Sequence, residues 1–187
     1  MHPRANVTGL IAVVLLTMMA AHCAVSREWL FDFGTEASMT QPGFTKVTAR
    51  TSYDAAKGHG FETVEGLTSA DRGGWEKTAP TSERRARTYG AYRTTADLIE
   101  GTADSTFIVQ VGPGDYTVWL IACDAHYEPP FFEVWANGAK QFDVRVPRRY
   151  FVFMEPFTVR SEDGLLKIEF RGPHGWLVNA LLISDDV

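Results

Sequence analysis

Three side chains that can bind metal ions or transfer protons stand at alternate positions in the segment ACDAHYEPPFF, namely Asp124, His126 and Glu128. A transition-metal site needs three or more converging ligands, and acid–base catalysis needs two titratable groups beside a bound substrate. The chain contains no HExxH motif and no paired Cys/His spacing of the kind found in zinc sites. Acid–base chemistry by Asp124 and His126 stays open, whereas a transition-metal site is not expected.

What this segment can do depends on whether it is a strand or a loop. The preceding residues, GDYTVWLIAC, alternate like a strand that ends near Cys123, and the two prolines that follow cannot join a central strand ladder. We therefore expect a loop in which Asp124, His126 and Tyr127 bind a ligand, because polar groups bond to hydroxyls and an aromatic ring covers an apolar face. The alternative is a structural loop whose Asp124 carboxylate caps backbone amides.

Two further candidates for ligand binding lie in other polar segments. The stretch from Thr68 to Thr95 is polar and aperiodic, and it contains a cluster of arginines together with Trp75. Its length favours either a solvated loop or a functional rim, on which Trp75 would stack against a ligand and the arginines would bind carboxylate or sulfate groups. His174 lies in the loop sequence GPHG, which we expect at one end of the fold.

Asp32 is the candidate metal ligand. It lies between Phe31 and Phe33, whose side chains share one face of an expected strand. Because a lone buried carboxylate is costly, Asp32 must be solvated, paired or bound to a cation. A structural calcium role for Asp32 stays open beside a bond to backbone amides or to an arginine.

Most of the remaining chain consists of expected strands separated by tight turns. In LLKIEFR, Leu166, Ile168 and Phe170 alternate with charged residues, which places the three on one face. The segments FIVQV, FFEVWA and QFDVRV repeat this period of two, and GPGD, ANG and SEDG are turn sequences. No long segment with helical periodicity follows the first 24 residues. The pattern predicts an all-β fold, with two antiparallel sheets packed as a sandwich.

The first 24 residues have the form of a secretory signal. Arg4 precedes the apolar run VTGLIAVVLLTMMAA, which is shorter than the roughly 20 residues of a membrane span, and no second hydrophobic segment follows. We therefore predict a signal peptide over residues 1–24 and one secreted or periplasmic domain over residues 25–187, with no transmembrane segment after signal removal. A lipid anchor at Cys23 is not expected, because His22 stands where such signals have a small residue.

The cysteine content and the net charge argue against a disulfide-stabilised fold and against nucleic acid as a partner. Signal removal leaves Cys123 alone, so no internal disulfide forms and the core must hold the domain. The formal net charge is −5, which argues against nucleic acid as a partner because basic patches drive that binding.

Several segments follow one another in a distinctive order along the chain. They are FDFG at 31–34, GFTKV at 43–47, GHGFE at 58–62, ADLIEG at 96–101, FIVQVGPGDYTVWLIACD at 107–124, FEVWANG at 132–138, LLKIEFRG at 165–172 and WLVNALLI at 176–183. This order resembles the galactose-binding-like β-sandwich modules attached to bacterial rhamnogalacturonan acetylesterases, polysaccharide lyases and agarases, which are relatives of carbohydrate-binding modules and malectin. The resemblance implies a jelly roll whose first strand, near residues 31–33, pairs with the last, near residues 179–183. It also implies ligand binding in loops at one end, and some such modules carry a structural calcium ion.

The resemblance implies sugar binding without chemistry, because the chain ends after the last expected strand and the esterase domain of the relatives is not expected. We predict an exported, non-catalytic carbohydrate-binding module for a polysaccharide or oligosaccharide, with a carbohydrate-active enzyme or a surface protein as a further partner. One alternative is a protein-interaction or structural domain of the cell envelope. Another is a small carbohydrate esterase or lyase with Asp124 and His126 in its site.

Overall fold

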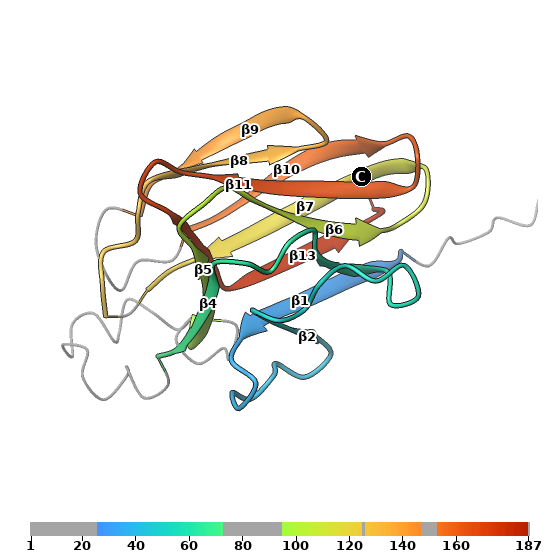
Figure 1. Cartoon of the computed structure of the whole chain (residues 1–187). Coiled ribbons are helices and arrows are strands. Elements are labelled where there is room, and N and C mark those ends of the chain that lie inside the picture. Colours follow the sequence, from blue (N-terminus) through green and yellow to red (C-terminus); the bar gives the residue numbers. More distant parts are fainter. Residues whose placement is uncertain (1–25, 73–94, 125, 147–152, 187) are drawn as a thin grey trace, which may run out of the picture.

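The computed structural model describes residues 26–72, 95–124, 126–146 and 153–186 (Figure 1). These ranges contain strands and loops and no α-helix, as predicted, and no membrane-spanning helix occurs within them. The expectations for residues 1–24 and for Trp75 lie outside the described residues. The strands are β1 (Glu28–Gly34), β2 (Thr45–Thr48), β3 (His59–Phe61), β4 (Leu67–Asp71), β5 (Asp97–Gly101), β6 (Ser105–Gln110), β7 (Gly114–Ala122), β8 (Phe132–Ala136), β9 (Ala139–Val144), β10 (Phe153–Ser161), β11 (Leu165–Arg171), β12 (Trp176–Val178) and β13 (Ala180–Ser184).

Two five-stranded sheets form the sandwich. One has the strand order β10-β7-β13-β1-β2 and the other the order β3-β6-β11-β8-β9. Phe31 of β1 lies opposite Leu181 of β13, so the predicted pairing of the first and last strands is confirmed. Within these two sheets every pairing is antiparallel except that of β1 with β2, which is parallel. The described chain is therefore an all-β sandwich, as the alternating segments predicted.

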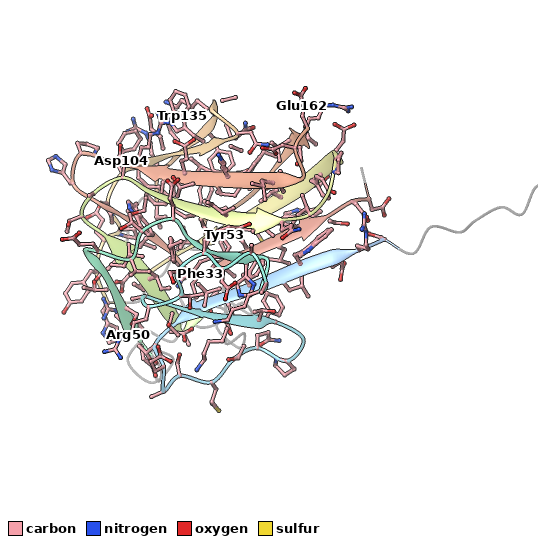
Figure 2. All side chains as sticks on the ribbon, turned by 45° about the vertical axis from the view of Figure 1, so that its right-hand side comes forward. Phe33, Arg50, Tyr53, Asp104, Trp135 and Glu162 are labelled. Carbon is pink, nitrogen blue, oxygen red and sulfur yellow. The ribbon has the colours of Figure 1, made fainter. Side chains whose placement is uncertain are left out.

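The period of two decides which side chains enter the core. Leu166, Ile168 and Phe170 of β11 are fully buried, whereas the residues between them are exposed or half-buried. Phe33 is also fully buried and lies inside the molecule in Figure 2, whereas Trp135 of β8 lies at its periphery. The core thus forms from alternate residues of facing sheets, as expected for a sandwich.

A third sheet, with the order β12-β5-β4, stands across the left-hand end of the sandwich in Figure 1. The prediction of a polar loop beginning at Thr68 is wrong for residues 68–71, because they pair with β5. The sequence TSAD lacks the apolar alternation that marks a strand, and tertiary pairing overrides this weak local signal. Trp176 of β12 packs on Phe170, with ring centroids 4.8 Å apart, and it covers Gly101, where a Cβ would collide with the indole.

The two ends of the sandwich are built differently. We call the end where β7 begins, at Gly114, the turn end, and the end where β7 finishes, at Ala122, the loop end. Short turns join strands at the turn end, and Asn137, Gly138 and Gly164 adopt φ angles of 47°, 80° and 85° there. These positions confirm the turns predicted from ANG and SEDG. The third sheet and the segment after β7 lie at the loop end.

Candidate functional site

The carboxylate of Asp124 organises the segment that follows β7. Its Oδ1 accepts the backbone N–H of His126 at 2.7 Å and that of Tyr127 at 3.1 Å. The guanidinium of Arg72 donates to the same carboxylate, from Nη2 to Oδ2 at 2.9 Å and from Nε to Oδ1 at 3.2 Å. The Asp124 side chain is only 3% exposed. Asp124 therefore caps backbone amides and fixes the loop, the structural role weighed for it from the sequence.

Arg72 joins this loop to the third sheet. It follows β4 directly, and its backbone N–H donates to the carbonyl of Ala96. The hydrogen bonds to Asp124 raise the pKa of Arg72 above its ordinary value. Because a bidentate pair has a fixed geometry and removal of one buried partner leaves an uncompensated charge, this pair sets the position of the loop.

Two exposed aromatic rings lie on this loop, and each faces an arginine. Tyr127 is 64% exposed, and the Cζ of Arg72 lies 5.1 Å from its ring centroid. Phe131 is 36% exposed, and the Cζ of Arg145 lies 4.2 Å from its ring centroid. A cation–π contact on one face restrains each ring. We call residues 123–124 and 126–131 the aromatic loop.

A buried amide holds the start of the aromatic loop. The Oδ1 of Asn179 accepts the backbone N–H of Cys123 at 2.6 Å, and its Nδ2 donates to the carbonyl of Asp97 at 2.7 Å. Asn179 is 1% exposed, so both bonds are shielded from water. Since Asp97 is the first residue of β5, this amide ties the end of β7 to the third sheet.

His126 and Glu128, the other polar residues of the opening motif, are exposed on the aromatic loop. The His126 ring centroid lies 6.3 Å from that of Tyr127, so the two side chains are neighbours. The Asp124 carboxylate serves Arg72 and backbone amides, and within the described ranges no hydrogen bond joins it to the His126 imidazole. Asp124, His126 and Tyr127 lie in one loop, as expected. The Asp124 carboxylate, which the sequence also offered as a ligand contact, is instead buried on Arg72 and backbone amides and supports the other two residues.

His174 shares the loop end with the aromatic loop. It is exposed in the turn that ends at Gly175. Gly172 of this turn lies against Phe132, the residue that follows the aromatic loop, and a Cβ at Gly172 would stand 2.9 Å from the Phe132 Cβ. The neighbouring Trp176 is buried and donates its indole N–H to the carbonyl of Ala103, so it packs in the core as expected.

Asp32, the predicted metal ligand, is 2% exposed, and its Oδ2 accepts the backbone N–H of Gln41 at 2.6 Å. In the part of the chain that the structure describes, no group of three or more His, Cys, Asp or Glu side chains is placed to hold a metal ion. The carboxylates near Asp32 therefore do not fit a metal centre built from side chains alone.

Two open hollows lie away from the aromatic loop. One, of about 580 Å³, lies at the turn end and is lined by polar residues that include Asn137, Glu162, Asp163 and Lys167. The other, of about 450 Å³, lies between β1 and β3 and is lined by residues that include Trp29, Phe31, Lys57, His59 and Gln110. Neither contains a residue that the sequence predicted as ligand-binding.

Sequence reasoning did not single out Arg72, Phe131 or Arg145. A signal for Phe131 existed, because the alternation of FFEVWA assigns Phe132 to the core and leaves an extra aromatic residue just before the strand. No comparable signal marked Arg72, since its partner Asp124 lies 52 residues further along the chain.

Comparison with solved structures shows the same fold in other proteins. The Bacillus subtilis protein YxiM matches 85% of this chain with a TM-score of 0.63 and 23% identity, over 40% of its own length. A calcium-binding mutant of Bacteroides uniformis β-glucuronidase 2 matches 86% of this chain with a TM-score of 0.62 and 12% identity, over 18% of the enzyme. The plant receptor-like kinase FER matches 84% of this chain with a TM-score of 0.55 and 14% identity, over 41% of its length.

These similarities show a β-sandwich fold, and the chain spans less than half of each of these proteins. No family model matches the chain, and no curated protein matches it by sequence.

Proposed function

We propose that this protein is a non-catalytic carbohydrate-binding module that grips a polysaccharide or oligosaccharide with its aromatic loop. The observation that carries this proposal is that Tyr127 is 64% exposed and yet its ring is held against Arg72. Arg72 is in turn fixed by its salt bridge to the buried carboxylate of Asp124. A ring held in place before binding loses little conformational entropy when a ligand arrives, which favours affinity.

The side chains around Tyr127 suit a sugar. Arg72 occupies one side of the Tyr127 ring, and the opposite side can stack on the apolar face of a pyranose. Exposed His126 and Glu128 offer a donor or acceptor and a carboxylate for hydroxyl groups. Phe131 supplies a second ring on the same loop, which favours a ligand longer than one sugar.

Peptide binding is the second candidate, and one comparison favours it. The receptor FER, which has the same fold over 85% of this chain at 11% identity, was captured in a complex with the plant peptide RALF23 and LLG2. A peptide would use Tyr127 and Phe131 as apolar anchors, as aromatic residues commonly act at protein interfaces. The sugar proposal is preferred because two exposed polar residues, His126 and Glu128, flank Tyr127 in the loop.

Affinity electrophoresis of the exported domain through pectic, xylan, galactan and agar gels tests the proposal. We expect at least one polysaccharide to retard the wild-type protein. Tyr127→Ala should then weaken binding about tenfold, as for loss of about 1.4 kcal/mol of stacking. Trp135→Ala is the matched control, because Trp135 also lies under an arginine, with the Arg171 Cζ 4.2 Å from its ring, but outside the aromatic loop.

Retardation that Trp135→Ala abolishes and Tyr127→Ala preserves would place the sugar elsewhere. No retardation in any gel, together with binding of a peptide ligand that Tyr127→Ala weakens, would favour the second candidate.

A further inference from the structure

The loop between β1 and β2, residues 35–44, is held by hydrogen bonds from the ammonium group of a lysine, Lys46. The ammonium of Lys46 donates to the carbonyl oxygen of Glu36 at 2.9 Å and also to the carbonyl oxygen of Ser38. Lys46 lies on β2, so its side chain reaches back across the loop that leads into its own strand. Converging backbone carbonyls are ligands that proteins use for hard cations such as calcium, and here they bind an ammonium group.

Two carboxylates lie in the same region as Lys46, and the charge of Lys46 acts on one of them, Asp97. Asp32 is the strand neighbour of Lys46 in the parallel pairing of β1 with β2, so both side chains lie on the same face of the sheet. Asp97 is 2% exposed and sits directly over Gly34, where a Cβ would collide with its carboxylate and with the Ser38 hydroxyl. Its Oδ1 is shielded from solvent and has no hydrogen-bond partner among the described residues. A shielded carboxylate oxygen of this kind favours a cation nearby.

We propose that Lys46 is the resident cation of this site, binding through its ammonium group the carbonyl oxygens that a metal ion could otherwise bind. The loop between β1 and β2 therefore needs no calcium ion. The proposal concerns how the fold is fastened and holds whether or not the aromatic loop binds sugar.

Charge and ligand number both favour the ammonium over a metal ion. Calcium takes six to eight oxygen ligands, whereas the two carbonyls of Glu36 and Ser38 match an ammonium group with three donors. The lysine is tethered to β2 and so is present at every calcium concentration. Its positive charge also repels a divalent ion from the same oxygens.

The site is connected to the aromatic loop through buried hydrogen bonds. The carbonyl of Asp97 accepts from Asn179, whose Oδ1 binds the N–H of Cys123 at the start of that loop. The charge of Lys46 acts on the Asp97 carboxylate, and Asp97 is the residue through which β5 is bonded to the start of the aromatic loop.

Thermal unfolding of the wild-type protein and of Lys46→Met tests the proposal. We expect the wild-type melting temperature to be the same in millimolar calcium chloride and in EDTA. Lys46→Met keeps the length of the side chain but loses two charge-assisted hydrogen bonds, so its melting temperature should fall by about 4 °C or more. Lys167→Met is the matched control, because Lys167 is an exposed strand lysine, and it should shift by less than about 2 °C.

The double variant Lys46→Met with Asp97→Asn measures whether the two side chains interact. If the ammonium stabilises ionised Asp97, Lys46→Met should cost clearly less stability in the Asp97→Asn background than in the wild type at pH 8, where Asp97 is ionised. The proposal is overturned if calcium raises the wild-type melting temperature by several degrees, or if Lys46→Met is no less stable than Lys167→Met. The calcium comparison decides even if Lys46→Met does not fold.

Discussion

The loop end and the turn end each contain an arginine–aspartate pair, and the two pairs have the same length but different surroundings. Arg72 and Asp124 at the loop end are 16% and 3% exposed, with 2.9 Å between Nη2 and Oδ2. Arg160 and Asp115 at the turn end are 66% and 55% exposed, with 2.9 Å between Nη1 and Oδ2. Water screens the exposed pair, whereas loss of one partner of the buried pair leaves an unpaired charge in the interior. Distance alone therefore does not identify the contact that holds the aromatic loop.

The chain segments that connect the strands also differ between the two ends. At the turn end, tight turns position the chain, and Asn137 binds the carbonyl of Arg160 and the N–H of Lys167 through its own amide. At the loop end, Asp124, Arg72 and Asn179 position a longer segment that exposes Tyr127 and Phe131. Side chains that fix a loop while leaving aromatic rings exposed are the arrangement expected of a binding surface, and they distinguish the loop end.

The largest effect that we expect is from Asp124→Ala. This change removes the partner of the half-buried Arg72 and uncaps the amides of the aromatic loop, so the free energy of unfolding should fall by about 3–5 kcal/mol. Asp115→Ala, the matched change at the turn end, should cost within about 1 kcal/mol. Urea denaturation of both variants measures the difference, and equal losses would remove the distinction between the ends.

The next effect is a pH dependence from Asp97. Burial, followed by the nearby charges of Asp32 and Asp71, raises the pKa of Asp97 to about 7, against the lowering effect of Ser38 and Lys46. The folded protein therefore binds a proton at pH values where the unfolded chain, with its ordinary pKa of 3.8, does not. This contribution to stability is fully present below about pH 4 and is lost as the pH rises through 7.

Asp97→Asn should remove this dependence. We expect the stability difference between wild type and variant to change by about 1–3 kcal/mol between pH 4 and pH 8, with the variant relatively more stable at pH 8. Denaturation curves at several pH values measure it. A difference that stays constant over this range would show that Asp97 is ionised in the folded protein throughout.

The smallest stability effect, and the sharpest functional one, concerns the two arginine-stacked aromatic residues. Tyr127→Ala should change the free energy of unfolding by less than about 1 kcal/mol, because the ring is mostly exposed. Trp135→Ala should cost about 1–2 kcal/mol, because the half-buried indole also donates to Glu133 at 2.8 Å. Urea denaturation of both variants measures these losses of stability. Trp135→Ala should be the less stable variant, whereas Tyr127→Ala should be the one that binds the ligand more weakly.

Local sequence patterns were sufficient to predict most of the strands and turns of the sandwich. Alternation in LLKIEFR and FFEVWA predicted the buried faces of β11 and β8, because a strand places every second side chain on one face. The turn at Asn137 and Gly138 was predictable because positive φ angles favour these residues. The pairing of β1 with β13 followed from the resemblance, since no local pattern specifies which strands meet.

Features that depend on long-range contacts could not be predicted in the same way. Strand β4 has little apolar alternation, and only its partner β5 makes residues 68–71 a strand. The sequence placed Asp124, His126 and Tyr127 in one loop, but it did not show that Arg72 would bury the carboxylate and leave Tyr127 exposed. Likewise, Asp32 could be recognised as a carboxylate that needs a partner, whereas the two carbonyls bound by Lys46 come from an irregular loop without a sequence signature.

An NMR titration of the ¹⁵N-labelled wild-type domain with oligosaccharides from the retarding polysaccharide tests the central claim most directly. The account predicts that the amide signals of His126, Tyr127 and Phe131 shift with added sugar, while those of Asn137 and Gly164 at the turn end stay in place. Shifts confined to the turn end, or to the hollow around Trp29 and His59, would contradict it.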